Sequence, residues 1–126
     1  MKKLLLYSNL ITLSLFILVG CSLNSKSSMT GIYLKSTDGS NIIIDDANYP
    51  TVMGNGTSKE NIFEIFKSGD KIEITCSVIN ETYPAQTQIY SLKLIEKGSP
   101  NNIPKDTLKK LKELGWTFDL SNKKIK

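Results

Sequence analysis

Histidine and arginine are absent from this 126-residue chain, and all 16 of its basic residues are lysines. The lack of histidine excludes Ser-His-Asp and Cys-His catalytic sets, and two cysteines are too few for a zinc site. The lack of arginine removes the side chain best suited to forked hydrogen bonds with phosphate or guanine. We therefore expect no nucleic-acid binding, and the sequence predicts no cofactor and no metal.

Cysteine is scarce, because the chain has only Cys21 and Cys76, and no disulfide framework is expected. Cys76 lies in an alternating segment, on the same face as Ile72, Ile74 and Val78. This position predicts a buried cysteine that behaves as a small hydrophobe. A reactive thiol would need a neighbouring base or a helix N-terminus to lower its pKa.

Long hydrophobic runs are also lacking. The longest, residues 4–19, is diluted by four polar residues and is shorter than the about 20 residues that span a bilayer. It follows Lys2 and Lys3, and a charged end before an apolar segment is typical of a secretory leader. An uncleaved anchor helix is the alternative interpretation. The run ends at Leu18-Val19-Gly20-Cys21.

These four residues resemble the lipobox of bacterial lipoproteins. The resemblance implies that Leu18, Val19 and Gly20 are recognised by a signal peptidase and that Cys21 becomes the first mature residue, carrying lipid such as palmitate. It predicts a signal peptide over residues 1–20 and a lipid anchor on the extracytoplasmic face of the cell membrane. The polar residues 21–28 then form a flexible tether.

The charge is unevenly distributed along the chain. Residues 21–104 hold seven lysines and nine acids, whereas residues 105–126 hold seven lysines and three acids. The basic end could contact anionic lipid or a wall polymer, although a solvated helix face is the favoured interpretation. The 106 residues after the leader are enough for one domain.

The first part of the body predicts a β-hairpin. Residues 30–35 and 41–45 are strand-like and flank Asp38-Gly39, a strong hairpin signal. The β-branched run Ile42-Ile43-Ile44 predicts a strand that is covered on both sides. Residues 46–57 are predicted to form a loop because they contain Pro50 and two glycines. Residues 59–67 are predicted to form a short helix capped by Ser58, with a short strand as the alternative.

The second part predicts two strands and a helix. Residues 70–79 and 89–96 alternate as strands at the centre of the core, with Tyr90, Leu92 and Leu94 on one face. Pro104 suits a first helical turn, and leucines recur at helical spacing up to Gly115. Residues 116–120 alternate again and are predicted to form a final short strand.

This order of elements predicts a mainly β protein with some α-helix. The expected fold is a small, partly open OB-like β-barrel at residues 29–98 that contains one short helix. Residues 99–126 would add a C-terminal helix and the short strand.

Glu81-Thr82-Tyr83-Pro84-Ala85-Gln86 is similar to the Glu-Ser-Tyr-Pro-Ala-Gln stretch of a family of small, uncharacterised lipoproteins of Gram-positive bacteria. The resemblance covers roughly residues 30–96 and implies the same barrel. Because the activity of that family is unassigned, the resemblance implies no chemistry.

The candidate binding surface comprises Glu81, Tyr83, Pro84 and Gln86. A Tyr-Pro pair at a barrel mouth can present an aromatic ring, with Glu81 and Gln86 as hydrogen-bonding groups. The favoured interpretation is nevertheless structural, a rigid connection in which Pro84 fixes the backbone and Tyr83 packs against the barrel. Asp45, Asp46 and Asn48 could offer oxygens to a cation such as Ca²⁺, but a turn is the favoured interpretation.

We therefore predict a membrane-anchored, non-catalytic binding or assembly module of the cell envelope. Its partners would be the membrane, through the lipid on Cys21, and an envelope protein or a glycan. The alternatives are a glycan-binding module and an accessory envelope hydrolase.

Overall fold

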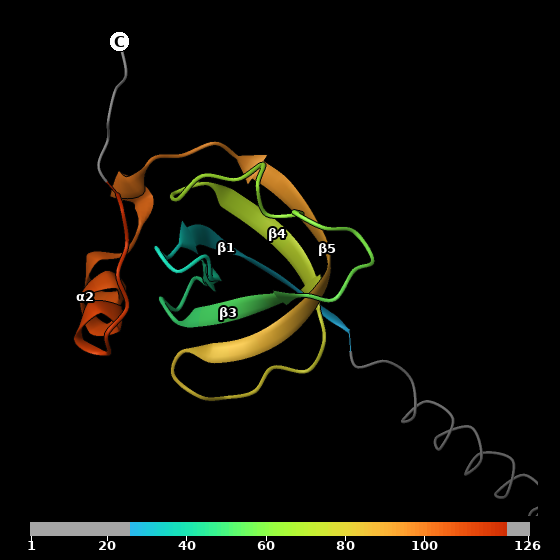
Figure 1. The fold of residues 1–126 in the computed structure, drawn as a ribbon, viewed down its shortest axis with the longest axis horizontal. Helices are drawn as coiled ribbons and strands as arrows, with labels where there is room; N and C mark the ends of the chain where they lie inside the picture. Colours follow the sequence, from blue (N-terminus) through green and yellow to red (C-terminus); the bar gives the residue numbers. More distant parts are fainter. Residues whose placement is uncertain (1–25, 121–126) are drawn as a thin grey trace, which may run out of the picture.

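The structure, a computed structural model, describes residues 26–120 (Figure 1). The predicted leader, the lipobox residues Leu18, Val19 and Gly20, and the lipidation site Cys21 lie outside the described residues. The elements are β1 (Ser27–Lys35), β2 (Asn41–Ile44), β3 (Pro50–Asn55), β4 (Lys71–Cys76), β5 (Ala85–Glu96), the 3₁₀-helix η1 (Pro100–Asn102) and α2 (Lys105–Glu113).

The five strands form a closed barrel in the order β1-β2-β3-β5-β4. β1 is long enough to pair with β2 through its second half and with β4 through its first half, both antiparallel. The ring closes through a parallel pairing of β3 with β5, in which Thr51 lies opposite Ala85. The predicted fold class, a mainly β protein with a small OB-like barrel and a C-terminal helix, is confirmed, although the barrel is closed and not partly open as predicted.

The barrel interior holds one apolar cluster centred on Tyr33. Its buried members come from all five strands and from the segment between β3 and β4: Tyr33, Ile43, Met53, Phe63, Phe66, Ile72, Ile74, Cys76 and Ile89. The Tyr33 hydroxyl donates a hydrogen bond to Asn41 Oδ1. Burial, and in second place the nearby Asp70 carboxylate, raise the pKa of Tyr33 to about 12.

The predicted helix over residues 59–67 is wrong, and so is the strand alternative, because this segment forms turns. Asn61 has a left-handed φ of 58°, and isolated hydrogen bonds such as Phe66 N to Phe63 O replace a helical ladder. The centroid of the Tyr33 ring lies 6.4 Å from the centroid of the Phe63 ring and 5.5 Å from that of the Phe66 ring. Packing both phenylalanines into the barrel stabilises the turns more than local helix propensity stabilises a helix.

The predicted loop over residues 46–57 is also wrong, because it contains β3. Pro50 is the first residue of this strand, a position where its missing N–H is tolerated. The preceding turn is tight, since Asp45 Oδ1 accepts hydrogen bonds from the backbone N–H groups of Ala47 and Tyr49, each at 2.9 Å. Proline and glycine mark a loop in isolation, but pairing with both β2 and β5 makes this segment a strand.

The two predicted strands at the centre of the core are confirmed as β4 and β5, and β5 begins earlier, at Ala85. β4 ends at Cys76, so the prediction that the strand continues to residue 79 with Val78 on its buried face is wrong. The pairing register shifts between Thr75 and Cys76. Consequently Ile89 faces the interior and Tyr90 is exposed, although Leu92 and Leu94 pack against the interior cluster. The prediction that Tyr90 shares a face with these leucines is therefore wrong, because a bulge breaks the alternation.

A second apolar cluster lies outside the barrel, where α2 covers β1, β2 and β3 (Figure 1). Its buried members are Leu34, Ile42, Ile44, Ile103 and Leu111. Ile43 belongs to the interior cluster, whereas Ile42 and Ile44 belong to the outer one. The prediction of a strand covered on both sides is thus confirmed.

The predicted C-terminal helix is confirmed as α2, and Gly115 ends it with a φ of 102°. The predicted strand over residues 116–120 is wrong, because this segment has no strand pairing. It runs along the barrel instead, with Trp116, Phe118 and Leu120 packed against the outer cluster. Apolar burial can hold an extended segment without a ladder of backbone hydrogen bonds. We call residues 105–120 the covering segment.

The predicted tether over residues 21–28 extends too far. β1 begins at Ser27, which lies opposite Cys76, and Ser28 lies opposite Thr75. Their backbone groups complete the pairing with β4, and serine side chains carry no hydrophobic signal for a strand. The barrel therefore begins two residues before the predicted boundary.

Candidate functional site

OB-type barrels bind ligands on the face of strands 2 and 3 and at the loops that follow strands 1 and 4. In this chain the outer face of β2 is buried, because Ile42 and Ile44 pack against Leu111 of α2 and its neighbours. Val52 of β3 packs against the same cluster. The face that such barrels commonly use is therefore occupied by the chain itself.

The loop between β1 and β2, residues 36–40, is also engaged by the covering segment. Thr37 N donates to Thr117 O at 2.9 Å, and the two threonine hydroxyls are hydrogen-bonded to each other. Within the loop, the Ser36 hydroxyl donates to Asp38. This bond, followed by the bond from Ser40 N, lowers the pKa of the exposed Asp38 carboxyl. The face of β2 and β3 is thus covered, and the β1–β2 loop is tied to the covering segment at Thr37.

The loop between β4 and β5, residues 77–84, is the third surface, and it contains most of the predicted site. Asn80 and Gln86 form a bridge that closes it, with Asn80 N to Gln86 O at 2.8 Å and Gln86 N to Asn80 O at 3.1 Å. The Thr82 hydroxyl donates to Pro84 O at 2.7 Å. These bonds hold residues 81–85 in one conformation. Gln86 contributes its backbone to this closure, and its side chain is exposed.

Tyr83 packs edge-on against Tyr49, with ring centroids 5.1 Å apart and an interplanar angle of 81°. Tyr49 comes from the turn between β2 and β3, and its hydroxyl donates to Thr82 O at 2.6 Å. Tyr83 is 37% exposed and Tyr49 is 39% exposed, so the pair leaves aromatic surface open to solvent. Partial burial, and then Tyr49, raise the pKa of Tyr83.

A hollow of about 290 Å³ lies beside this pair, and we call it the mouth pocket. Its walls come from β1, the β2–β3 turn, β3, the β4–β5 loop and the start of β5: Met29, Asp45, Tyr49, Thr51, Ile79, Glu81 and Ala85. Met29 and Ile79 also pack against the interior cluster, so the floor is apolar. Asp45 and Glu81 contribute carboxylates, and Tyr49 contributes a ring.

The structure brings together part of the predicted binding surface. Glu81 lines the mouth pocket, and Tyr83 supports its aromatic wall through Tyr49. Pro84 and Gln86 do not line it. Sequence reasoning missed Tyr49 and considered Asp45 only for a turn or a cation site, because both lie more than 30 positions before Glu81 and Tyr83.

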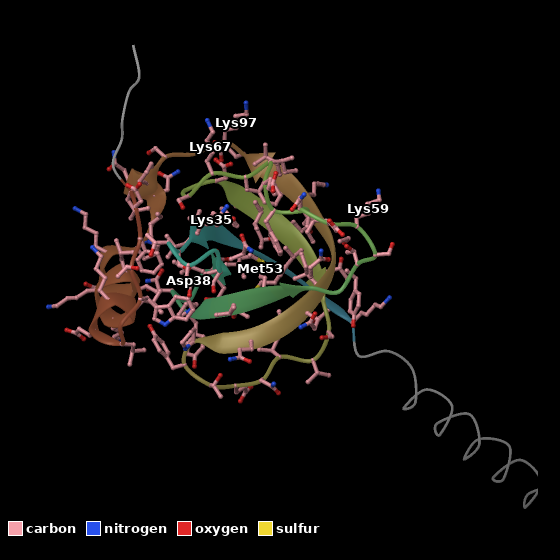
Figure 2. The ribbon with its side chains drawn as sticks, viewed as in Figure 1. Lys35, Asp38, Met53, Lys59, Lys67 and Lys97 are labelled. Carbon is pink, nitrogen blue, oxygen red and sulfur yellow. The ribbon has the colours of Figure 1, made fainter. Side chains whose placement is uncertain are left out.

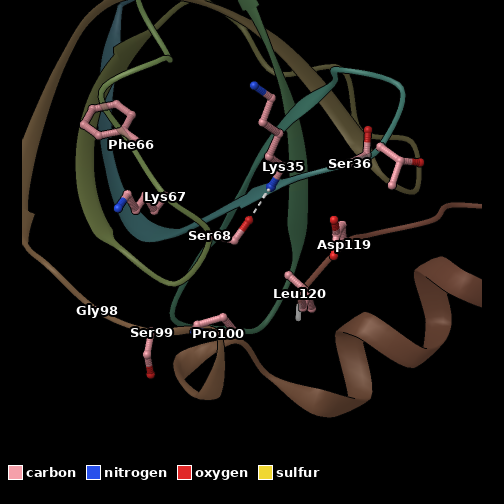
Figure 3. Close-up of a pocket in the computed structure, with 11 residues that line it drawn as sticks. Lys35, Ser36, Phe66, Lys67, Ser68, Gly98, Ser99, Pro100, Asp119 and Leu120 are labelled. Atoms are coloured by element: carbon pink, nitrogen blue, oxygen red, sulfur yellow. Dashed lines mark hydrogen bonds between the residues drawn. The ribbon is translucent and has the colours of Figure 1, made fainter. Parts of the chain in front are cut away.

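A larger hollow, of about 490 Å³, lies between the end of β1, the turn before β4 and the covering segment (Figure 3). Ser68 Oγ accepts a hydrogen bond from Lys35 N at 3.0 Å across it. Lys35, Lys67 and Asp119 line it, so it carries charges of both signs. Because residues 119 and 120 form one wall, this hollow is a crevice where the covering segment meets the barrel.

Lys59, Lys67 and Lys97 project outward into solvent (Figure 2).

Cys76 and the turn that contains Asp45 and Asp46 both have the structural roles that the sequence favours. Cys76 is a fully buried free thiol, as predicted, with Sγ 3.7 Å from Ser27 Oγ. The two amides bound to Asp45 Oδ1 support the turn interpretation of Asp45 and Asp46. Among residues 26–120, no group of three or more histidine, cysteine or acidic side chains is placed to hold a metal ion.

Comparison of the chain with known proteins yields no match among protein-family models, curated proteins or solved structures. Within the described part of the chain, no helix has the length and apolar character needed to cross a membrane.

Proposed function

We propose that this protein is a lipoprotein anchored to the extracytoplasmic face of the cell membrane through Cys21. Its barrel would be a non-catalytic binding or assembly module of the cell envelope. The anchor is supported by Lys2 and Lys3, the apolar run that follows them and the Leu18–Cys21 pattern. We also propose kinship with the small lipoproteins of Gram-positive bacteria that carry a Glu-Ser-Tyr-Pro-Ala-Gln stretch.

One observation carries the binding role. Of the three surfaces through which OB-type barrels usually bind, the face of β2 and β3 is covered and the β1–β2 loop is hydrogen-bonded to the covering segment at Thr37. The β4–β5 loop borders a hollow with an exposed tyrosine pair. Tyrosine offers apolar area together with a polar tip, which suits recognition at a partly wet site. A volume of about 290 Å³ is near the lower end of the roughly 300–1,000 Å³ of small-molecule sites. We infer that the pocket accepts one ring or one side chain of a larger ligand.

A glycan is the second candidate ligand, and the composition of the pocket favours it. A sugar ring has an apolar face that can pack on Tyr49 or Tyr83, and its hydroxyls can donate to Glu81 and Asp45. The loop after strand 4 is a site where OB-type barrels bind oligosaccharides.

The anchor is tested by growth with labelled palmitate. We expect the wild type and the Cys76→Ala variant to incorporate label and the Cys21→Ala variant to lose it. Label retained by Cys21→Ala would contradict the lipoprotein assignment.

The binding site is tested by photo-crosslinking in living cells from position 83, with position 95 as the matched control. Ile95 is exposed to a similar degree but lies near the other end of β5, away from the mouth pocket. We expect a specific adduct from position 83 only. Equal adducts from both positions would argue against this site.

A glycan array then separates the ligand classes. Glycan binding should disappear in Tyr83→Ala and in Tyr49→Ala while the melting temperature remains close to wild type. Turnover of a wall polymer that is lost in Glu81→Gln would instead support the accessory hydrolase.

A further inference from the structure

The described chain begins at a defined end of the barrel. Ser27, the first residue of β1, lies opposite Cys76, the last residue of β4, and Cys76 in turn lies opposite Ile89 of β5. α2 packs on the other side of the barrel from this point (Figure 1). Any anchor attached before Ser27 therefore acts on this end of the molecule.

Two exposed apolar side chains lie near the same end. Val78 follows Cys76 by two positions and is 67% exposed, and Tyr90 directly follows Ile89 and is 40% exposed. The Lys26 ammonium lies 4.9 Å from the centroid of the Tyr90 ring. We call Lys26, Val78 and Tyr90 the N-terminal patch. Single exposed apolar residues are normal on soluble proteins, so exposure alone does not identify a contact surface.

The short stretch of chain between Cys21 and the barrel limits the distance between a lipid on Cys21 and the first residue of β1. Six Cα-to-Cα steps separate Cys21 from Ser27, and six steps span at most about 22 Å even when fully extended. With lipid on Cys21, Ser27 cannot move farther than this from the bilayer surface, and the N-terminal patch lies beside Ser27. Such a short link keeps the patch at a high effective concentration beside the headgroups.

We propose that the N-terminal patch lies against the headgroup region of the lipid bilayer, an inference that rests on the lipid anchoring proposed above. Tyrosine rings are enriched at the membrane interface, and lysine can place its stem along apolar surface and its ammonium near a phosphate. Val78 adds an apolar group to the same contact.

The basic face of α2 is the alternative surface for contact with the bilayer. It carries Lys105, Lys109, Lys110 and Lys112, and each lysine near an anionic surface strengthens the attraction to it. That attraction requires anionic lipid and weakens with salt. The N-terminal patch contains one charge, so its contact should persist on neutral lipid and at high salt.

This orientation has a consequence for the mouth pocket. The β4–β5 loop begins directly after Cys76, beside the N-terminal patch, and continues to Glu81 and Tyr83. Its ligand would therefore be met close to the headgroups, while the lysines of α2 face away from the membrane.

The test uses residues 21–126 coupled through Cys21 to a maleimide phospholipid in vesicles. Vesicles of phosphatidylcholine alone are compared with vesicles that also contain phosphatidylglycerol, with a spin-labelled lipid as the quencher. The reporter is a single tryptophan, introduced as V78W in a W116F background. L114W in the same background is the matched control, because Leu114 is an exposed apolar residue at the end of α2.

We expect strong quenching of V78W in both kinds of vesicle, unchanged by salt, and little quenching of L114W. Quenching of L114W equal to or above that of V78W, or quenching only with phosphatidylglycerol, would overturn the proposal. Y90W replaces V78W if the latter lowers the melting temperature. Because the lipid is attached chemically, this result is independent of whether cells lipidate Cys21, which the palmitate experiment decides.

Discussion

Replacing Leu111 by alanine should destabilise the whole domain, because this side chain joins α2 to the outside of the barrel. Leu111 is fully buried in the outer cluster with Leu34, Ile42 and Ile44. A Leu→Ala change at such a site removes buried apolar atoms and leaves a cavity, at a cost of about 2–5 kcal/mol. Domains of this size have unfolding free energies of about 5–15 kcal/mol, so the variant should lose a large share of its stability.

The matched control is Leu114→Ala in the turn that ends the same helix. Leu114 is 57% exposed, so its truncation should change stability by no more than about 0.5 kcal/mol. Both changes remove the same atoms, and alanine and leucine both have high helix propensity, so propensity contributes little at Leu111. Any difference between them therefore measures the burial of Leu111 against the barrel.

Urea unfolding can be followed by two independent signals. Far-UV circular dichroism reports on the barrel, and fluorescence reports on Trp116, the single tryptophan, which lies in the covering segment. The two clusters share β2, whose alternate residues point to opposite sides. We expect coincident transitions in the wild type. In Leu111→Ala both should move to lower urea, with the Trp116 signal changing first if the covering segment separates.

A midpoint for Leu111→Ala that matches Leu114→Ala would refute the outer cluster as described. It would mean that α2 does not bury Leu111 and that the face of β2 and β3 is open. In that case the assignment of the mouth pocket as the remaining binding surface would also fail.

Three further predictions concern the barrel itself. Asp70 is buried, and its carboxylate accepts hydrogen bonds from Lys67 N at 2.9 Å and from Gly98 N at 3.0 Å. The Asp70→Ala variant should therefore lose about 1–3 kcal/mol of unfolding free energy for each amide left unpaired, as measured by urea unfolding. Asp70→Asn, which keeps one acceptor oxygen, should cost less, and equal losses would contradict this role. Because the folded state holds the Tyr33 proton more tightly than the unfolded chain, stability should fall by about 2 kcal/mol as the pH rises from 10 to 12. The Tyr33→Phe variant should show a shallower fall over that range, and an identical profile would exclude Tyr33 as the cause. In a Cys21→Ser chain, Cys76 should react with a thiol reagent only on unfolding, and fast reaction of the native protein would show that the thiol is accessible.

Several elements could be predicted because their signal is local. The hairpin of β1 and β2 follows from an alternating segment and a β-branched run on either side of Asp38-Gly39, and α2 follows from leucines at helical spacing between Pro104 and Gly115. The double coverage of β2 was also predictable, since β-branched residues occupy both of its faces.

The wrong predictions concern segments in which contacts with residues distant in the sequence outweigh the local secondary-structure propensity. Residues 59–67 have helical spacing, but Phe63 and Phe66 meet Tyr33, and turns place both rings in the barrel. Pro50 marks a loop locally, yet a strand begins there because β2 and β5 both provide backbone partners.

The candidate site likewise contains residues that could be identified from the sequence and residues that could not. Glu81 and Tyr83 could be selected from the sequence because a Tyr-Pro pair flanked by polar groups stands out along the chain. Asp45 and Tyr49 could not be selected, because only the closed barrel brings the β2–β3 turn beside the β4–β5 loop.

The sequence by itself determined which chemistries are excluded, where hydrophobic alternation produces strands, and where α2 begins and ends. It also predicts the lipid anchor on Cys21. These properties depend on residue type and near-neighbour spacing. Only the tertiary structure decided that β3 and β5 close the ring, that the covering segment occupies the usual ligand face, and that the mouth pocket remains open. Those properties depend on which distant apolar surfaces exclude water together, and local spacing does not encode that choice.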